Sequence, residues 1–71
     1  MNTRTAKKIQ ANLDRMESLL GELAAMKARM NVAIAEGRSG EAVAPETLAR
    51  LRAIRRLLKE LNERNKVLAR R

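Results

Sequence analysis

The sequence predicts an all-α protein, folded as an antiparallel hairpin of two long amphipathic helices. Three observations favour this fold. Apolar residues recur at alternating spacings of three and four, a single Gly- and Ser-containing break separates two such stretches, and the 71 residues include no Phe, Tyr or Trp. A core built only from Leu, Ile, Met, Val and Ala suits helix packing better than it suits a β-sandwich or barrel.

The first helix is expected over residues 5 to about 36, with Thr3 or Thr5 as its amino-terminal cap. Its apolar residues occupy the a and d positions of a heptad repeat, in which Lys27 is the only charged a residue. Apolar residues at g positions widen this stripe, as is typical of a bundle helix with more than one neighbour. The predicted seam, meaning the line of apolar contact, comprises Ile9, Leu13, Met16, Leu20, Leu23, Met30 and Ile34, and the widening g residues are Leu19, Met26 and Ala33.

A break and a second helix follow. Gly37 is suited to the left-handed conformation that ends helices, and residues 37–44 are expected to form the only loop. Pro45 is a favourable first residue for a helix that extends to about residue 70, because its missing amide costs nothing there. The predicted seam on this helix comprises Leu51, Ile54, Leu58, Leu61 and Leu68.

The chain is short enough to form one domain, and it has no Cys for disulfides or thiolate metal ligands. A domain of this size usually needs a cross-link, a metal or a partner for stability. Two helices can cover only part of each other's wide apolar stripes. We therefore expect the hairpin to complete a four-helix bundle, either as a homodimer or by docking on a larger assembly.

Three polar residues fall on the predicted seam, and one of them, Thr47, lies at an early d position. Asn65, at an a position, either pairs with an equivalent Asn across a dimer and fixes its register, or lies where the helix frays into solvent. Lys27 can lay its aliphatic stem along the seam while its ammonium group reaches water or a facing carboxylate. Gly21 lies just off the seam, where it either permits close approach of a helix or is simply tolerated.

The charge is strongly unbalanced. The chain has 16 Lys and Arg against eight Asp and Glu, for a net charge of +8, which favours polyanionic partners. Most of the excess lies on the second helix, where basic residues recur at three- and four-residue spacings and share a surface stripe. The residues expected to contact a nucleic-acid backbone are Arg50, Arg52, Arg55, Arg56, Lys59, Lys66 and Arg70.

The alternative is a solvated face, partly neutralised by pairs four residues apart, or a face that meets acidic protein. The pairs in question are Arg56–Glu60, Lys59–Glu63 and Glu60–Arg64. Base-specific recognition is not favoured, since the chain lacks aromatic residues for stacking, a zinc finger and the short turn of a helix-turn-helix.

Catalysis is not expected. The chain has no His, Cys or Tyr, and its few Ser and Thr residues have no base nearby. No cofactor, metal or small-molecule substrate is expected. No apolar run approaches the roughly 18 residues of a membrane span, and the amino-terminal segment lacks the apolar region of a secretory signal. We expect a cytoplasmic protein, or one within a virion or ribonucleoprotein particle.

The stretch GEAVAPETLARLRAIRRLLKELNER, residues 40–64, resembles the second half of the small two-helix protein of the large ribosomal subunit. In that family too, an Arg-rich helix follows a Gly and a Pro. The first helix here lacks the block that precedes the family's turn. The resemblance implies an RNA partner and is not a family assignment. Two functions are therefore expected: a self-associating hairpin that docks on nucleic acid, or a structural subunit or adaptor of a virion, secretion or regulatory complex.

Overall fold

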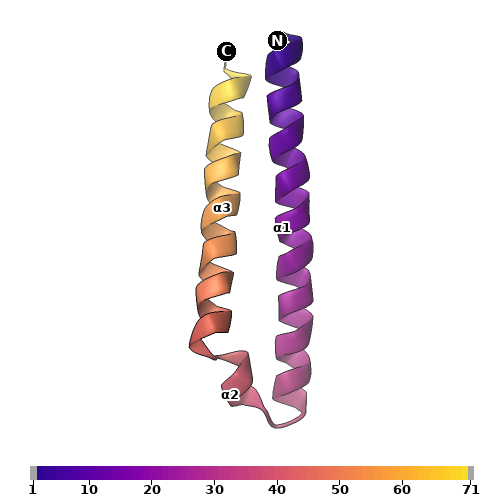
Figure 1. The fold of residues 1–71 in the computed structure, drawn as a ribbon, viewed down its shortest axis with the longest axis vertical. Coiled ribbons are helices and arrows are strands. Elements are labelled where there is room, and N and C mark those ends of the chain that lie inside the picture. Colours follow the sequence, from indigo (N-terminus) through magenta and orange to yellow (C-terminus); the bar gives the residue numbers. More distant parts are fainter. Residues whose placement is uncertain (1, 71) are drawn as a thin grey trace.

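The computed structural model describes residues 2–70 and has three helices: α1 (Thr3–Ala35), α2 (Ser39–Ala42) and α3 (Pro45–Ala69). The two long helices run antiparallel side by side, with α2 at the turn and both ends of the chain at the opposite extremity (Figure 1). The predicted helical hairpin is thereby confirmed. We call the end of the hairpin that contains α2 the loop end and the opposite end the open end.

The amino-terminal cap of α1 differs from the prediction. Asn2 is the capping residue, and its side-chain oxygen accepts a hydrogen bond from the amide of Thr5 at 2.8 Å. Thr3 is already the first residue of α1. The prediction of a Thr cap was therefore wrong, because an Asn one residue earlier satisfies the free amide equally well.

The carboxyl-terminal end of α1 follows the prediction for Gly37, which has a φ of 78°. The Gly37 amide donates to the carbonyl of Ile34, and the Arg38 amide donates to the carbonyl of Ala33. These bonds satisfy carbonyls that the end of a helix leaves free.

The segment predicted as a loop contains the short helix α2. Its Ala42 is only 2 % exposed, so this turn of helix packs on the hairpin. Arg38 forms ion pairs with Glu36 and Glu41 beside it. The expectation of a loop over residues 37–44 was too simple, because Gly and Ser composition alone does not reveal a single helical turn. Pro45 begins α3 as expected.

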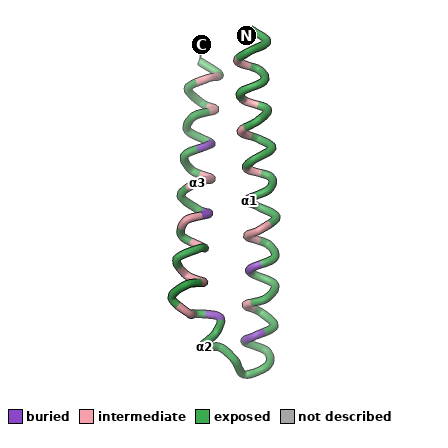
Figure 2. The backbone as a smooth tube through the Cα atoms, viewed as in Figure 1, coloured by how far each residue is buried: buried purple, intermediate pink, exposed green. Residues whose placement is uncertain are grey.

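The core of the hairpin is small and lies along one line of contact. Leu19 and Ile54 are almost fully buried, and Met26 and Leu61 complete the central cluster. Buried positions are few. Apart from Ala42 of α2, they lie on the facing sides of the two long helices, whereas the outward sides are exposed (Figure 2).

The seam on α1 is displaced from the expected a and d positions. The buried α1 residues occupy g positions, and Met16, Leu23 and Met30 at d are half-buried. Three residues expected at a positions in the seam, Leu13, Leu20 and Ile34, are instead 47 %, 53 % and 55 % exposed. The hairpin thus uses the g and d side of a wide apolar stripe and leaves the a side uncovered.

Asn65 also has a different environment from either expectation. Helix α3 continues to Ala69, and Asn65 is half-buried against α1. Its side-chain oxygen accepts a hydrogen bond from Asn12 of the same chain at 2.8 Å. A methyl group added at Gly21 would meet nothing within 4 Å, so this glycine does not serve close approach within the hairpin.

Candidate nucleic-acid interface

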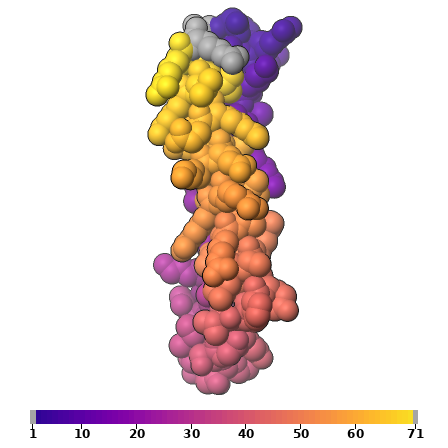
Figure 3. All heavy atoms as spheres, turned by 90° about the vertical axis from the view of Figure 1, so that its left-hand side faces the viewer, coloured from indigo at the N-terminus to yellow at the C-terminus, as the bar shows by residue number. Residues whose placement is uncertain are grey.

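The outward side of α3 carries a stripe of cationic side chains. Because Ile54 and Leu61 face α1, residues about half a turn away from them face solvent. Figure 3 shows the molecule from this side, with α3 in front of α1. We call this set the basic stripe, and all of its members are exposed: Arg52, Arg55, Arg56, Lys59, Lys66 and Arg70.

Little of this charge is neutralised within the chain. Among residues 2–70, the one ion pair made by the basic stripe joins Lys66 to Glu63 at 3.4 Å, with both side chains more than half exposed. None of the three predicted pairs four residues apart is formed within that part of the chain. The other five cations of the stripe therefore lie in solvent, with no carboxylate of the described residues within 4 Å.

Arg50 has a different environment from the rest of the predicted contact residues. Its Nε and one terminal nitrogen donate to the two carboxylate oxygens of Glu22 on α1, each at 2.7 Å. The hydrogen bond from Arg50 lowers the pKa of Glu22, and the same bond raises the pKa of Arg50. This two-point contact joins the long helices, so the structure does not group Arg50 with the basic stripe.

The charge is also distributed unevenly along the hairpin. The open half, residues 2–19 and 55–70, has ten basic and four acidic residues. The loop half, residues 20–54, has five basic and four acidic residues. The antiparallel fold brings the cationic start of α1 beside the cationic end of α3, a proximity that neither segment reveals alone (Figure 1). The positive potential is therefore strongest towards the open end.

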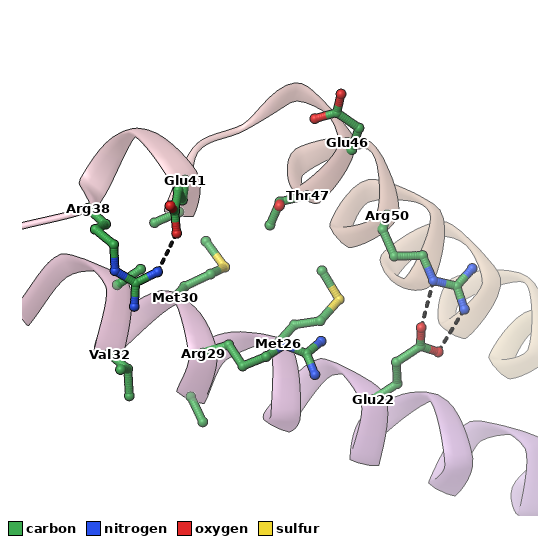
Figure 4. Close-up of a pocket in the computed structure, with 13 residues that line it drawn as sticks. Glu22, Met26, Arg29, Met30, Val32, Arg38, Glu41, Glu46, Thr47 and Arg50 are labelled. Carbon is green, nitrogen blue, oxygen red and sulfur yellow. Dashed lines mark hydrogen bonds and ion pairs between the residues drawn. The ribbon is translucent and has the colours of Figure 1, made fainter. Parts of the chain in front are cut away.

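A surface pocket of about 660 Å³ lies at the loop end, between α1, α2 and the start of α3. Figure 4 shows Met26, Met30 and Thr47 around it, with the Glu22–Arg50 and Arg38–Glu41 contacts at its edges. Its charged side chains are thus largely matched with one another. In residues 2–70 no cluster of three or more His, Cys, Asp or Glu residues is arranged to hold a metal ion.

No helix in the described part of the chain is both long enough and apolar enough to cross a membrane. Sequence reasoning identified the basic stripe but missed the contacts of Asn12, Glu22 and Arg38. The signal for Arg38 was present, since Glu36 and Glu41 flank it within three residues. The contacts of Asn12 and Glu22 cross between helices, and a single helical pattern does not encode them.

The chain matches no protein-family model, and no curated protein or solved structure is significantly similar to it.

Proposed function

We propose that this protein is a non-catalytic assembly protein that self-associates through its apolar surface and docks the basic stripe of α3 on a nucleic-acid backbone. The observation that carries the proposal is the group of five exposed cations on one helix face with no carboxylate of residues 2–70 within 4 Å. Such cations repel each other in the free protein, and a row of phosphates relieves that repulsion.

The form of the stripe favours backbone contact over base reading. It runs along α3 from Arg52 to Arg70, and the chain has no aromatic residue to stack on bases. Phosphate contacts give affinity and orientation with little sequence preference. The proposed partner is therefore RNA or DNA bound without sequence specificity, in the cytoplasm or within a nucleoprotein particle.

A salt titration with paired variants tests the proposal. The slope of log affinity against log salt should fall by about 0.9 on duplex DNA for every phosphate that a variant no longer neutralises. The variant Arg52→Gln/Arg56→Gln should therefore bind more weakly and with a shallower slope. The control Arg38→Gln removes one cation from the ion pairs at the turn and should leave the slope nearly unchanged.

Absorbance offers an independent check. Because the chain has no Trp or Tyr, absorbance at 260 nm in the purified protein reports bound nucleic acid. Wild-type protein that purifies free of nucleic acid at low salt, and that does not retard RNA or DNA there, contradicts the proposal.

The second candidate is a structural subunit or adaptor that docks on protein, with the basic stripe facing acidic side chains. The exposure of Leu13, Leu20 and Ile34 favours it, because aligned apolar side chains on one helix suit a protein partner. Binding that comes mainly from these side chains should survive high salt. Salt dependence therefore separates the two functions.

A further inference from the structure

The exposed a positions of α1 form a second apolar surface, distinct from the seam inside the hairpin. We call it the outer apolar stripe; it comprises Ala6, Leu13, Leu20, Lys27 and Ile34. Successive residues of an α-helix are about 100° apart around its axis. The side of α1 that faces α3 lies midway between Leu19 and Leu23. Around the helix axis, Leu20 is roughly 80° to one side of this direction and Glu22 is roughly 80° to the other. The Glu22–Arg50 contact therefore closes the opposite edge of the hairpin.

We infer that the outer apolar stripe packs against the same stripe of a second copy of the chain, antiparallel, with the two-fold axis beside Leu20. This deepens the self-association in the proposed function, on which it rests, by naming the face, the register and the orientation. The two loop ends then lie at opposite ends of the dimer, and α1 packs on α1 and α3 on α3.

The size of the face suits a stable dimer. The hairpin measures 53 Å by 16 Å across its two long axes. The outline of this face, roughly 850 Å² for the Cα atoms, is large enough to contain the roughly 800 Å² that each partner buries in a stable protein interface. The half-buried Met16, Leu23, Leu51 and Leu58 extend the apolar surface between the helices. A second copy would bury them further and complete a core that one hairpin leaves small.

The spacing of the stripe fits an antiparallel copy. Its five residues are centred on Leu20, so Leu20 meets its own equivalent, and small Ala6 meets large Ile34. Leu13 then lies beside the aliphatic stem of Lys27. Helix side chains lean towards the amino end, which aims the Lys27 ammonium at Glu17 of the other copy. Neither Lys27 nor Glu17 has an ion-pair partner within residues 2–70.

The distribution of charge along the length of the hairpin favours the same orientation, whereas packing α3 on α3 brings the two basic stripes to one face and costs some repulsion between them. In the antiparallel dimer, the open half, with six more basic than acidic residues, covers the loop half, with an excess of only one. In the parallel alternative, the two open halves would face each other. Like charges brought together in this way oppose association.

Sedimentation equilibrium in about 0.5 M salt without nucleic acid, where exposed charges are screened, tests the face. Leu13→Gln/Leu20→Gln should raise the dimer dissociation constant on the order of 100-fold, since each change acts twice in a symmetric interface. The control is Val32→Gln, at a residue equally exposed on α1 but outside the stripe, and it should dissociate like the wild type. Leu13 and Leu20 lie outside the hairpin's own seam, so their replacement does not weaken the hairpin directly. If the double variant loses helix on dilution and the wild type does not, the loss therefore also reports dissociation of the dimer.

Two further measurements test register and orientation. At low salt, Glu17→Lys and Lys27→Glu should each weaken the dimer several-fold, and the combined variant should regain most of the affinity. The chain has no Cys, so Ser39→Cys places one spin label at each loop end. The label separation should be near the 53 Å length of the hairpin.

A wild-type monomer at high concentration overturns the inference. So does a double variant that dimerises like the wild type, or a short distance between the labels. These measurements contain no nucleic acid, so they can fail while α3 still binds polyanions. Conversely, failure of polyanion binding would leave all three results unchanged.

Discussion

Asn12 on α1 donates a hydrogen bond to Asn65 on α3, with 2.8 Å between the two side-chain atoms, and both residues are half-buried. The bond joins residues 53 positions apart in the sequence, at a point where these two side chains interrupt an otherwise apolar seam. A slip of one helix by a turn would leave both amides facing apolar neighbours. The pair therefore selects the register of the hairpin more than it adds stability.

A double-mutant cycle tests this pair. Asn12→Leu or Asn65→Leu alone should cost about 1 kcal/mol in the free energy of unfolding, because the remaining amide has no partner. The combination should recover that cost, since an apolar pair then replaces a polar one. Chemical denaturation followed by circular dichroism at 222 nm measures all four proteins. Strictly additive effects would show that the two side chains do not interact in solution.

The Glu22–Arg50 contact predicts how stability depends on pH. Arg50 holds the pKa of Glu22 below its ordinary value in the folded protein. The contact's contribution to the free energy of unfolding is fully present above the unfolded-state pKa of Glu22, about 4.5. It disappears as the pH falls through the lower folded-state pKa. Denaturation curves for wild type and Glu22→Gln should therefore approach each other as the pH falls below 4.5 and meet once it is below the folded-state pKa of Glu22. Curves that keep the same separation from pH 7 to pH 3 would contradict the contact.

The helices were largely predictable because their information is local. Heptad spacing, Gly37 and Pro45 each constrain the chain within a few residues, and the structure ends α1 and begins α3 close to them. Which side of α1 meets α3 was not predictable in the same way. The a/d and g/d lines both alternate three and four residues, so periodicity alone could not choose between them.

In the candidate interface too, features within one helix were predictable and contacts between helices were not. The basic stripe was predictable because its members share one face of a single helix, whatever that helix packs against. Arg50 was predicted as a member of this group, and its contact with Glu22 was not predictable, because its position on the edge facing Glu22 depends on how α3 is rotated against α1. Contacts between helices require register and rotation, and a single sequence pattern does not specify either.

Replacing Gly21 or Gly37 by Ala should change the free energy of unfolding in opposite directions. An added methyl group meets nothing within 4 Å at Gly21 or at Gly37, so only backbone conformation differs. Gly21→Ala should stabilise the protein by about 0.5–1 kcal/mol, because Ala favours a helix interior. Gly37→Ala should destabilise it by about 1 kcal/mol, since φ there is 78°. Thermal unfolding of both variants checks the signs, and a stabilising Gly37→Ala would contradict the turn geometry.

The inferred dimer also predicts how many nucleic-acid segments one complex holds. Packing α3 on α3 places both basic stripes on the same face of the bundle, whereas the parallel alternative places them on opposite faces. One face should engage one duplex, so the dimer should not link a biotin-labelled duplex to a second, fluorescent duplex in a bead capture assay. The monomeric variant Leu13→Gln/Leu20→Gln should still bind a duplex through its single α3. Its slope of log affinity against log salt should be about half that of the dimer. Efficient capture of the fluorescent duplex at limiting protein would favour the parallel arrangement, because only stripes on opposite faces can hold two segments apart.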